Sequence, residues 1–256
     1  MSKNFELLSQ LGRVQEILQK PEESLPALPE EPQALVASIV PTTTLAVHGS
    51  AREEVIKLVR NLFFLPGSNA PHHVVFAGTE PGAGCSWICS HAAEVLAAQV
   101  RGQVCVVDCN LRAPSLHEQL GASNHHGLTE ALLRSGSIRQ YTVRLSPPNL
   151  YLLSSGSARE GEQALLGSES MRARLSELYS QFDYVLLDVA ALSTSNDGVV
   201  LGRAADGVVL VLRANSTRRE TALKAVEELQ AAKVEALGAV LNQRTFPIPN
   251  AIYKYL

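Results

Sequence analysis

The stretch Val74–Ser90 reads VVFAGTEPGAGCSWICS. An apolar run opens it, a glycine-rich turn follows from Gly78 to Gly84, and an apolar, alanine-rich segment continues to Val100. A strand, a glycine-rich turn and a helix in this order are typical of a P-loop, whose signature ends in Gly-Lys followed by Ser or Thr. Cys85 stands where that lysine is expected, and Ser86 keeps the hydroxyl. The stretch therefore predicts a nucleotide-binding fold in which one functional residue is altered.

Length, composition and charge restrict the class of protein. With 256 residues the chain is long enough for one α/β domain with a large core and a short appendage. The net charge of -3 argues against a nucleic-acid partner held by general basicity. No apolar run approaches the roughly 20 residues that span a bilayer. The first residues, MSKNFELLSQ, lack the apolar core of a signal peptide. We therefore expect a cytoplasmic protein that binds no nucleic acid.

Short runs rich in Val and Leu alternate with amphipathic segments along most of the chain. Runs that are apolar throughout are typical of strands covered on both faces, and strand-helix alternation gives a mostly parallel sheet. We predict an α/β, three-layer P-loop NTPase-like fold with a mostly parallel central sheet, preceded by an N-terminal helix and linker. The expected strands are 73–77, 103–108, 150–154, 183–188, 207–212 and 236–241. The expected helices are 50–65, 86–100, 127–134, 169–181, 197–204 and 217–232.

The chain divides into four predicted parts. Residues 1–20 have leucines at helical spacing and form an amphipathic helix, and residues 21–48 form a proline-rich linker. The helix either docks on a partner or packs back on its own domain. Residues 49–246 form the P-loop domain, and residues 247–256 form a tail that carries Tyr253 and Tyr255.

The loop residues that remain indicate phosphate binding. In a P-loop the glycines let backbone N–H groups turn inward around the phosphates, and the helix N-terminus adds a positive dipole end. Gly78, Gly82, Gly84 and Ser86 keep these features. Cys85 lacks the ammonium group that normally bridges the phosphates and offsets charge in the transition state. The sequence therefore predicts residual nucleotide binding and inefficient phosphoryl transfer.

The four cysteines are Cys85, Cys89, Cys105 and Cys109. They form two C-x-x-x-C pairs, which is not the spacing of the common zinc motifs, and Cys89 and Cys105 fit as small apolar residues of a helix and a strand. At a helix N-terminus, Cys85 is expected to have a lowered thiol pKa. A lowered thiol pKa would suit a redox role for Cys85. The alternative is that cysteine is tolerated at this position because the lysine is no longer needed.

Two aspartates follow apolar strands, at Asp108 and Asp188. A carboxylate at the end of a strand orients water on magnesium in nucleotide-binding folds. Either aspartate alone could be a cap at the end of its strand. Both together, in order after a P-loop, favour a nucleotide fold.

Three motifs give the chain a family resemblance over about residues 50–245. It resembles the cytoplasmic kinase domain of the bacterial tyrosine kinases (BY-kinases), capsule and exopolysaccharide regulators within the deviant-Walker ATPases of the MinD and ParA types. The first family motif is G-x-x-P-G-x-G-K-[ST], which Gly78–Ser86 follows except at the lysine. The second, D-x-D-x-R, is matched by Asp108–Arg112 with Asn110 as its second acid. The third, D-[ST]-P-P, keeps only Asp188.

The resemblance implies roles for the matching residues. It implies ATP or ADP with Mg²⁺ as ligands, and an E-x-x-R-x-x-R-like helix that mediates self-association in a ring. The implied residues are Gly78, Pro81, Gly82, Gly84, Cys85, Ser86 and Asn242 for nucleotide; Ser86, Asp108 and Asp188 for Mg²⁺; Asp108 and Asp188 for catalysis; Glu54, Lys57 and Arg60 for subunit contacts; and Tyr253 and Tyr255 as phosphate acceptors. Asn242 matches the asparagine that contacts adenine.

The departures from the family pattern all remove catalytic groups and leave the fold intact. They predict a pseudokinase that acts by binding and assembly in exopolysaccharide biosynthesis or export. The resemblance implies a membrane polysaccharide co-polymerase as the partner, which would recruit the chain to the inner face of the membrane. One alternative is an active tyrosine autokinase in which Arg112 or Arg213 replaces the lysine. The other is a ParA-like positioning ATPase, although that type needs a lysine early in the loop, where this chain has Thr79.

Overall fold

A computed structural model of the protein describes residues 50–64, 70–157 and 161–243. The predicted N-terminal helix, the linker, Tyr253 and Tyr255 lie outside these residues. The described chain forms a seven-stranded sheet in the order β3-β4-β2-β5-β1-β6-β7, and β3 alone runs antiparallel to its neighbour. The strands are β1 His73–Gly78, β2 Val104–Asp108, β3 Val143–Arg144, β4 Leu150–Leu153, β5 Tyr184–Val189, β6 Gly207–Arg213 and β7 Ala236–Asn242. The predicted α/β, mostly parallel P-loop fold is confirmed.

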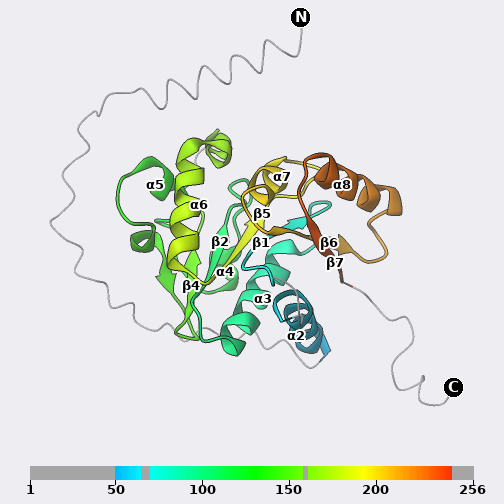
Figure 1. The fold of residues 1–256 in the computed structure, drawn as a ribbon, viewed down its shortest axis with the longest axis horizontal. Helices are drawn as coiled ribbons and strands as arrows, with labels where there is room; N and C mark the ends of the chain where they lie inside the picture. The colour runs from blue at the N-terminus through cyan, green and yellow to red at the C-terminus, as the bar shows by residue number, and fades with distance from the viewer. Residues whose placement is uncertain (1–49, 65–69, 158–160, 244–256) are drawn as a thin grey trace, which may run out of the picture. The chain divides into compact units, whose positions relative to one another are not determined.

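Helices cover both faces of the sheet (Figure 1). One face packs against α2 Ser50–Phe63, α3 Cys85–Gln99 and α4 Leu116–Gln119. The other packs against α5 Leu128–Leu133, α6 Glu169–Gln181, α7 Asp197–Gly202 and α8 Arg219–Ala231. Two 3-10 helices, Ile138–Tyr141 and Glu162–Gly167, lie in the connections.

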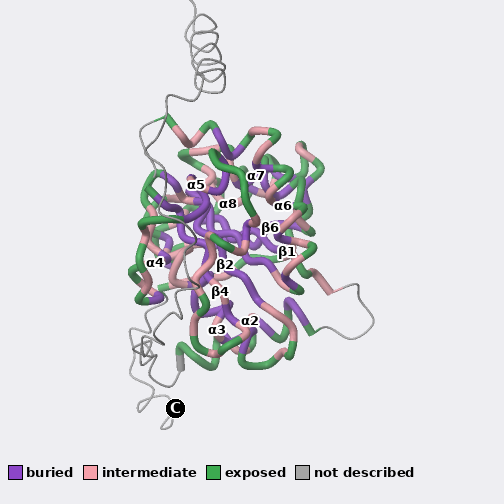
Figure 2. The backbone as a smooth tube through the Cα atoms, turned by 90° about the vertical axis from the view of Figure 1, so that its left-hand side faces the viewer, coloured by how far each residue is buried: buried purple, intermediate pink, exposed green. Residues whose placement is uncertain are grey.

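The strands are apolar throughout because both of their faces are buried. In β1, Val74 and Phe76 belong to the core on the α3 side, whereas Val75 and Ala77 belong to the core on the α6 side. Figure 2 shows the buried residues concentrated along the strands, between the helical layers. Each predicted strand and helix from residue 50 onward is found within two residues of its expected ends. The short elements β3, α4 and the two 3-10 helices were not predicted.

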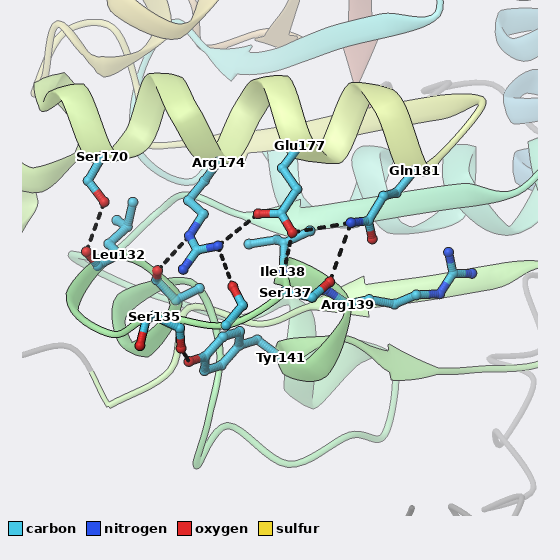
Figure 3. Close-up of polar contacts among 12 residues, drawn as sticks. Leu132, Ser135, Ser137, Ile138, Arg139, Tyr141, Ser170, Arg174, Glu177 and Gln181 are labelled. Atoms are coloured by element: carbon cyan, nitrogen blue, oxygen red, sulfur yellow. Dashed lines mark hydrogen bonds and ion pairs between the residues drawn. The ribbon is translucent and has the colours of Figure 1, made fainter.

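Arg174 joins α6 to the end of α5 (Figure 3). Its guanidinium donates hydrogen bonds to the carbonyls of Ala131, Arg134 and Gly136, each at 2.7 Å. It also pairs with Glu177 at 2.7 Å, and a Glu177 oxygen accepts the Ile138 N–H. The last carbonyls of a helix have no partner within the helix. Arg174 supplies that partner, with a charge that suits the negative end of the helix dipole.

Candidate nucleotide site

The loop between β1 and α3 has the backbone of a phosphate-binding turn. Gly82 and Gly84 have φ of 79° and 80°, a left-handed conformation that only glycine adopts without strain. Within the described residues, the N–H groups of Gly82, Gly84, Cys85 and Ser86 donate to no protein acceptor. The loop borders a pocket of about 240 Å³. Free N–H groups beside a pocket at a helix N-terminus are suited to an anion.

The sheet places the two candidate aspartates side by side. Asp108 and Asp188 are paired in the parallel register of β2 and β5. Asp108 and Asp188 lie two residues after Val106 and Leu186, which belong to the core on the α3 side, so both aspartates lie on the face of the sheet that carries the loop helix. The sequence located each aspartate at a strand end, and the structure brings them together.

Asp108 is fully buried and acts as a cap within its own connection. One carboxylate oxygen accepts the N–H groups of Ser115 and Leu116 at 3.0 Å each, and the other accepts the N–H of Asn110 at 3.2 Å. Burial raises the pKa of Asp108 to about 6, against the lowering effect of these three N–H groups. Asp108 therefore has a demonstrable structural role at the start of α4.

Asp188 differs from Asp108 because it has no such partners. The residue is fully buried, and neither carboxylate oxygen has a hydrogen bond of normal geometry within the described part. Burial, followed by the neighbouring charge of Asp108, raises the pKa of Asp188 to about 7, although Ser86 and Cys85 lie close by and oppose the shift. Hard oxygen ligands are what Mg²⁺ requires. An unpartnered carboxylate beside the Ser86 hydroxyl therefore fits Mg²⁺ bound together with phosphate oxygens.

The expectation of a lowered pKa for the Cys85 thiol is wrong. Burial is the largest cause, and together with the charge of Asp188 it raises the pKa well above the ordinary value. The dipole at the helix N-terminus is outweighed because the thiol lies next to a carboxylate rather than a cation. Burial also raises the pKa of the other three cysteines, and all four thiols are free. In the described ranges, no group of three or more His, Cys, Asp or Glu side chains is arranged to hold a metal ion.

No lysine or arginine lines the pocket within the described residues. Arg112 and Arg213, the candidates for replacing the missing lysine, are exposed and are not among the lining residues. The one charged side chain in the lining is acidic, Glu80. An anion in this pocket would therefore meet backbone N–H groups without a balancing cation from the lining.

The pocket has a polar wall that sequence reasoning missed. Trp87, Ser115 and Gln119 line it, and Gln119 accepts a hydrogen bond from Ser90 at 2.9 Å. The Trp87 indole is stacked on His91, with ring centroids 4.1 Å apart. Trp87 could have been found, because it follows Ser86 directly and must lie in the first turn of the helix. Gln119 carries no signal in the sequence, because only folding brings α4 to the loop.

Asn242 lies at the end of β7, against the loop. Its side-chain amide donates to the Ala83 carbonyl at 2.9 Å. The structure therefore places Asn242 against the glycine-rich loop, and its role in nucleotide binding and its contact with adenine stay predictions.

The charge row on α2 is exposed. Lys57 pairs with Glu54 at 2.7 Å, and Arg60 is exposed on the same helix, while Val55 and Val59 face the core. An exposed ion pair contributes little to stability, so the row is free to serve a contact. No helix among the described residues is both long and apolar enough to cross a membrane.

No family model matches the chain. Tyrosine-protein kinase YwqD of Bacillus subtilis (strain 168) is 31% identical over 194 residues, which cover 75% of this chain and 81% of YwqD. Tyrosine-protein kinase wzc of Salmonella typhimurium is 25% identical over 190 residues, which cover 74% of this chain but only 26% of wzc. The chain thus spans about a quarter of the length of that longer relative.

Solved structures agree with this relationship. The chimerical protein CapA2B2 is similar to this chain with a TM-score of 0.72 and 25% identity, over 79% of this chain and 90% of that one. A ParA family ATPase from Chlorobium tepidum TLS, at 20% identity and a TM-score of 0.56, shares the fold over 68% of this chain and 75% of its own. From its motifs, its fold and its similarity to YwqD, the chain belongs to the family of bacterial tyrosine-protein kinases.

Proposed function

We propose that this chain is a catalytically impaired member of its family that binds ATP or ADP with Mg²⁺ weakly and acts by assembly in exopolysaccharide biosynthesis or export. The observation that carries the proposal is the thiol of Cys85 beside Asp188, where the family motif has a lysine. Without an ammonium group, the transition-state charge of a transferring phosphoryl group has no cation from this loop.

The retained parts of the site support residual binding. Unpaired N–H groups of the loop would contact phosphate oxygens, and Ser86 with Asp188 would hold Mg²⁺, which supplies charge neutralisation when bound. Hydrogen bonds to charged groups contribute roughly 1.5–3 kcal/mol each, so losing the lysine should weaken nucleotide affinity by about one to two orders of magnitude. Asn110, in place of the second family aspartate, lines the pocket as a neutral side chain and removes a further catalytic carboxylate.

Cys85→Lys is expected to tighten Mg-ADP and Mg-ATP binding by roughly 10- to 100-fold, because the ammonium restores a charged partner for the phosphates. Calorimetry measures both affinities for the wild type and the variant. Cys85→Met is the matched control, because it adds length without charge and should leave the affinity near that of the wild type. An equal gain in Cys85→Met would show that charge is not the cause. No gain in Cys85→Lys would contradict the proposal that the site still accepts nucleotide.

An active tyrosine autokinase is the second candidate, favoured by the retention of Asp188, Ser86 and the loop backbone. Mass spectrometry of the wild type after incubation with Mg-ATP separates the two proposals. Phosphate on Tyr253 or Tyr255, together with micromolar ATP affinity, would refute the proposal that the chain is catalytically impaired. We expect no phosphotyrosine in the wild type.

The assembly role rests on the α2 row and on the parts outside the P-loop domain. We assign the P-loop domain to residues 49–246. Glu54, Lys57 and Arg60 are proposed to contact a second copy of the chain, and residues 1–20 are proposed to contact a membrane polysaccharide co-polymerase that recruits the protein to the inner face of the membrane. The row is exposed, and its helix is anchored through the opposite, apolar face.

The double variant Lys57→Glu, Arg60→Glu is expected to shift the protein to a lower molar mass, because it makes the row uniformly acidic and like charges repel across a two-fold or ring contact. Light scattering coupled to size-exclusion chromatography measures the mass. Lys224→Glu on α8, an exposed charge reversal away from the row, is the control. If the wild type is an oligomer and the double variant has the same molar mass, α2 does not form the interface.

A further inference from the structure

The carbonyl groups of a phosphate-binding loop need hydrogen-bond partners of their own. If the N–H groups turn inward toward an anion, the C=O groups turn outward, and each needs a partner in the protein or in solvent. The Gly78 carbonyl accepts the Leu192 N–H at 2.9 Å, and the Thr79 carbonyl accepts the Ser193 N–H at 3.3 Å. The Glu80 carbonyl accepts the Ala83 N–H at 3.3 Å, which closes the turn. The carbonyls of the next loop residues are satisfied from elsewhere.

Two carboxamides at the end of β7 bind those carbonyls. Asn242 donates to the Ala83 carbonyl at 2.9 Å, and Gln243 donates to the Gly82 carbonyl at 3.1 Å. The pair is braced internally, because the Gln243 N–H donates to the Asn242 side-chain oxygen at 2.8 Å. Gln243 has a φ of 56°, which turns the chain toward the loop directly after the strand. We name these two side chains the carboxamide clasp.

The clasp also explains the last glycine of the loop. A Cβ atom added at Gly84 would lie 2.3 Å from the side-chain nitrogen of Asn242, well inside contact distance. A Cβ atom at Gly82, whose φ is almost the same, would meet no atom within 4 Å. A glycine is therefore required at position 84 for two reasons. Its backbone is left-handed, and the Asn242 side chain approaches it closely.

We propose that Gln243 is a positioning residue of the nucleotide site, which together with Asn242 holds the loop carbonyls outward so that the loop N–H groups stay directed at the phosphates. This inference rests on the proposed nucleotide binding. Residues at the end of the edge strand β7 would then determine the conformation of the loop, although the hydrogen-bonded residues are about 160 positions apart in sequence. The clasp also limits Asn242, whose oxygen and one N–H each already make a hydrogen bond, to one further N–H and one further oxygen lone pair for a bound base.

The test variant is Gln243→Asn. Asparagine tolerates the left-handed backbone but is one methylene too short to reach the Gly82 carbonyl. We expect the backbone amide of Ala83, whose N–H is hydrogen-bonded to the Glu80 carbonyl, to exchange with deuterium about three- to tenfold faster, which corresponds to the loss of one hydrogen bond. Mg-ADP affinity should fall about three- to tenfold for the same reason. Trp87, the one tryptophan of the chain, borders the pocket and provides a fluorescence signal for the titration. Gln230→Asn, on an exposed position of α8, is the matched control.

The two readouts separate this inference from the proposed function. Hydrogen exchange is measured without ligand, so faster exchange at the Ala83 amide supports the clasp even if the wild type binds no nucleotide. Failure of the wild type to bind nucleotide would refute the proposed nucleotide binding alone. Unchanged exchange in Gln243→Asn, at wild-type melting temperature, would overturn the clasp. A fall in exchange protection spread over the whole sheet would also overturn it, since a general loss of stability would then be the cause.

A glycine pair gives a second, independent test. Gly82→Ala and Gly84→Ala both place alanine in a left-handed conformation at a similar cost, but only Gly84→Ala displaces Asn242. Gly84→Ala should therefore raise the exchange rate of the hydrogen-bonded Ala83 amide about tenfold more than Gly82→Ala does, since it disrupts the clasp in addition to straining the backbone. Equal effects of the two substitutions would overturn the role of the clasp.

Discussion

Asp188→Asn is expected to increase the free energy of unfolding by about 2 kcal/mol at pH 8. The wild-type carboxylate is fully buried and makes no hydrogen bond of normal geometry within the described residues, although Ser86 and Cys85 lie close by, and its pKa rises from 3.8 to about 7 on folding. That shift means that ionising the carboxyl group costs roughly 4 kcal/mol more in the folded state than in the unfolded state. Asparagine avoids this cost, but its buried amide has N–H groups without partners, which offsets part of the gain in stability. The substitution should therefore stabilise the fold while it removes the proposed Mg²⁺ ligand.

The gain in Asp188→Asn should depend on pH in a defined direction. Because the folded pKa lies above the unfolded pKa, the folded state binds the proton more tightly, and the wild type loses stability as pH rises from about 4 to about 7. The difference between variant and wild type should thus change sign with pH. The variant should be about 2 kcal/mol less stable than the wild type near pH 4, where the wild-type carboxyl is neutral, and about 2 kcal/mol more stable above pH 7. Urea denaturation at both ends of that range measures it. Glu227→Gln, on an exposed position of α8, removes the same charge and should change neither value. A variant less stable than the wild type at pH 8 would contradict the unpartnered state of Asp188.

Arg174→Ala is expected to lower the free energy of unfolding by about 3 kcal/mol, because it removes three hydrogen bonds to carbonyls and one ion pair at once. Arg174 is 13% exposed in its side chain and binds three carbonyls at the end of α5 as well as Glu177 (Figure 3). No other side chain among the described residues donates to those three carbonyls, so each would lose its partner. For a chain of this size the melting temperature should fall by roughly 6–12 °C.

Arg172→Ala is the matched control for this prediction. Arg172 lies on the same helix and pairs with Glu169 at 2.9 Å, but both side chains are more than two-thirds exposed, at 71% and 86%. Exposed pairs of this kind contribute about 0.5 kcal/mol or less, so the control should change the melting temperature little. Similar losses in the two variants would show that helix propensity rather than the α5 contacts explains the effect.

The sequence predicted the core of the fold because periodicity and burial are local signals. Strands such as β5, which is apolar from Tyr184 to Leu187, have one interpretation in an alternating α/β chain. The two-residue strand β3 could not be found, because it exists through its pairing with β4 rather than through its own residues. The same holds for α4, which is four residues long and begins where Asp108 accepts its first N–H groups.

The candidate site could be predicted as a set of residue types but not in its electrostatics. The loop glycines, Ser86 and the two aspartates were visible as motifs. The pKa of Cys85 was predicted in the wrong direction, because spacing reveals the helix N-terminus and does not reveal that Asp188 lies beside the thiol. The different states of Asp108 and Asp188 also depend on tertiary contacts, since equivalent positions on neighbouring strands differ only in which N–H groups reach them.

The hydrogen bonds of Gln243 have a practical consequence for shortened or fused versions of the protein. A version that ends at Gln243 keeps both amides, whereas one that ends at Leu241, still within β7, removes both and leaves the carbonyls of Gly82 and Ala83 without partners. The C-terminal boundary chosen for such a version therefore also decides whether the loop carbonyls of Gly82 and Ala83 keep their partners.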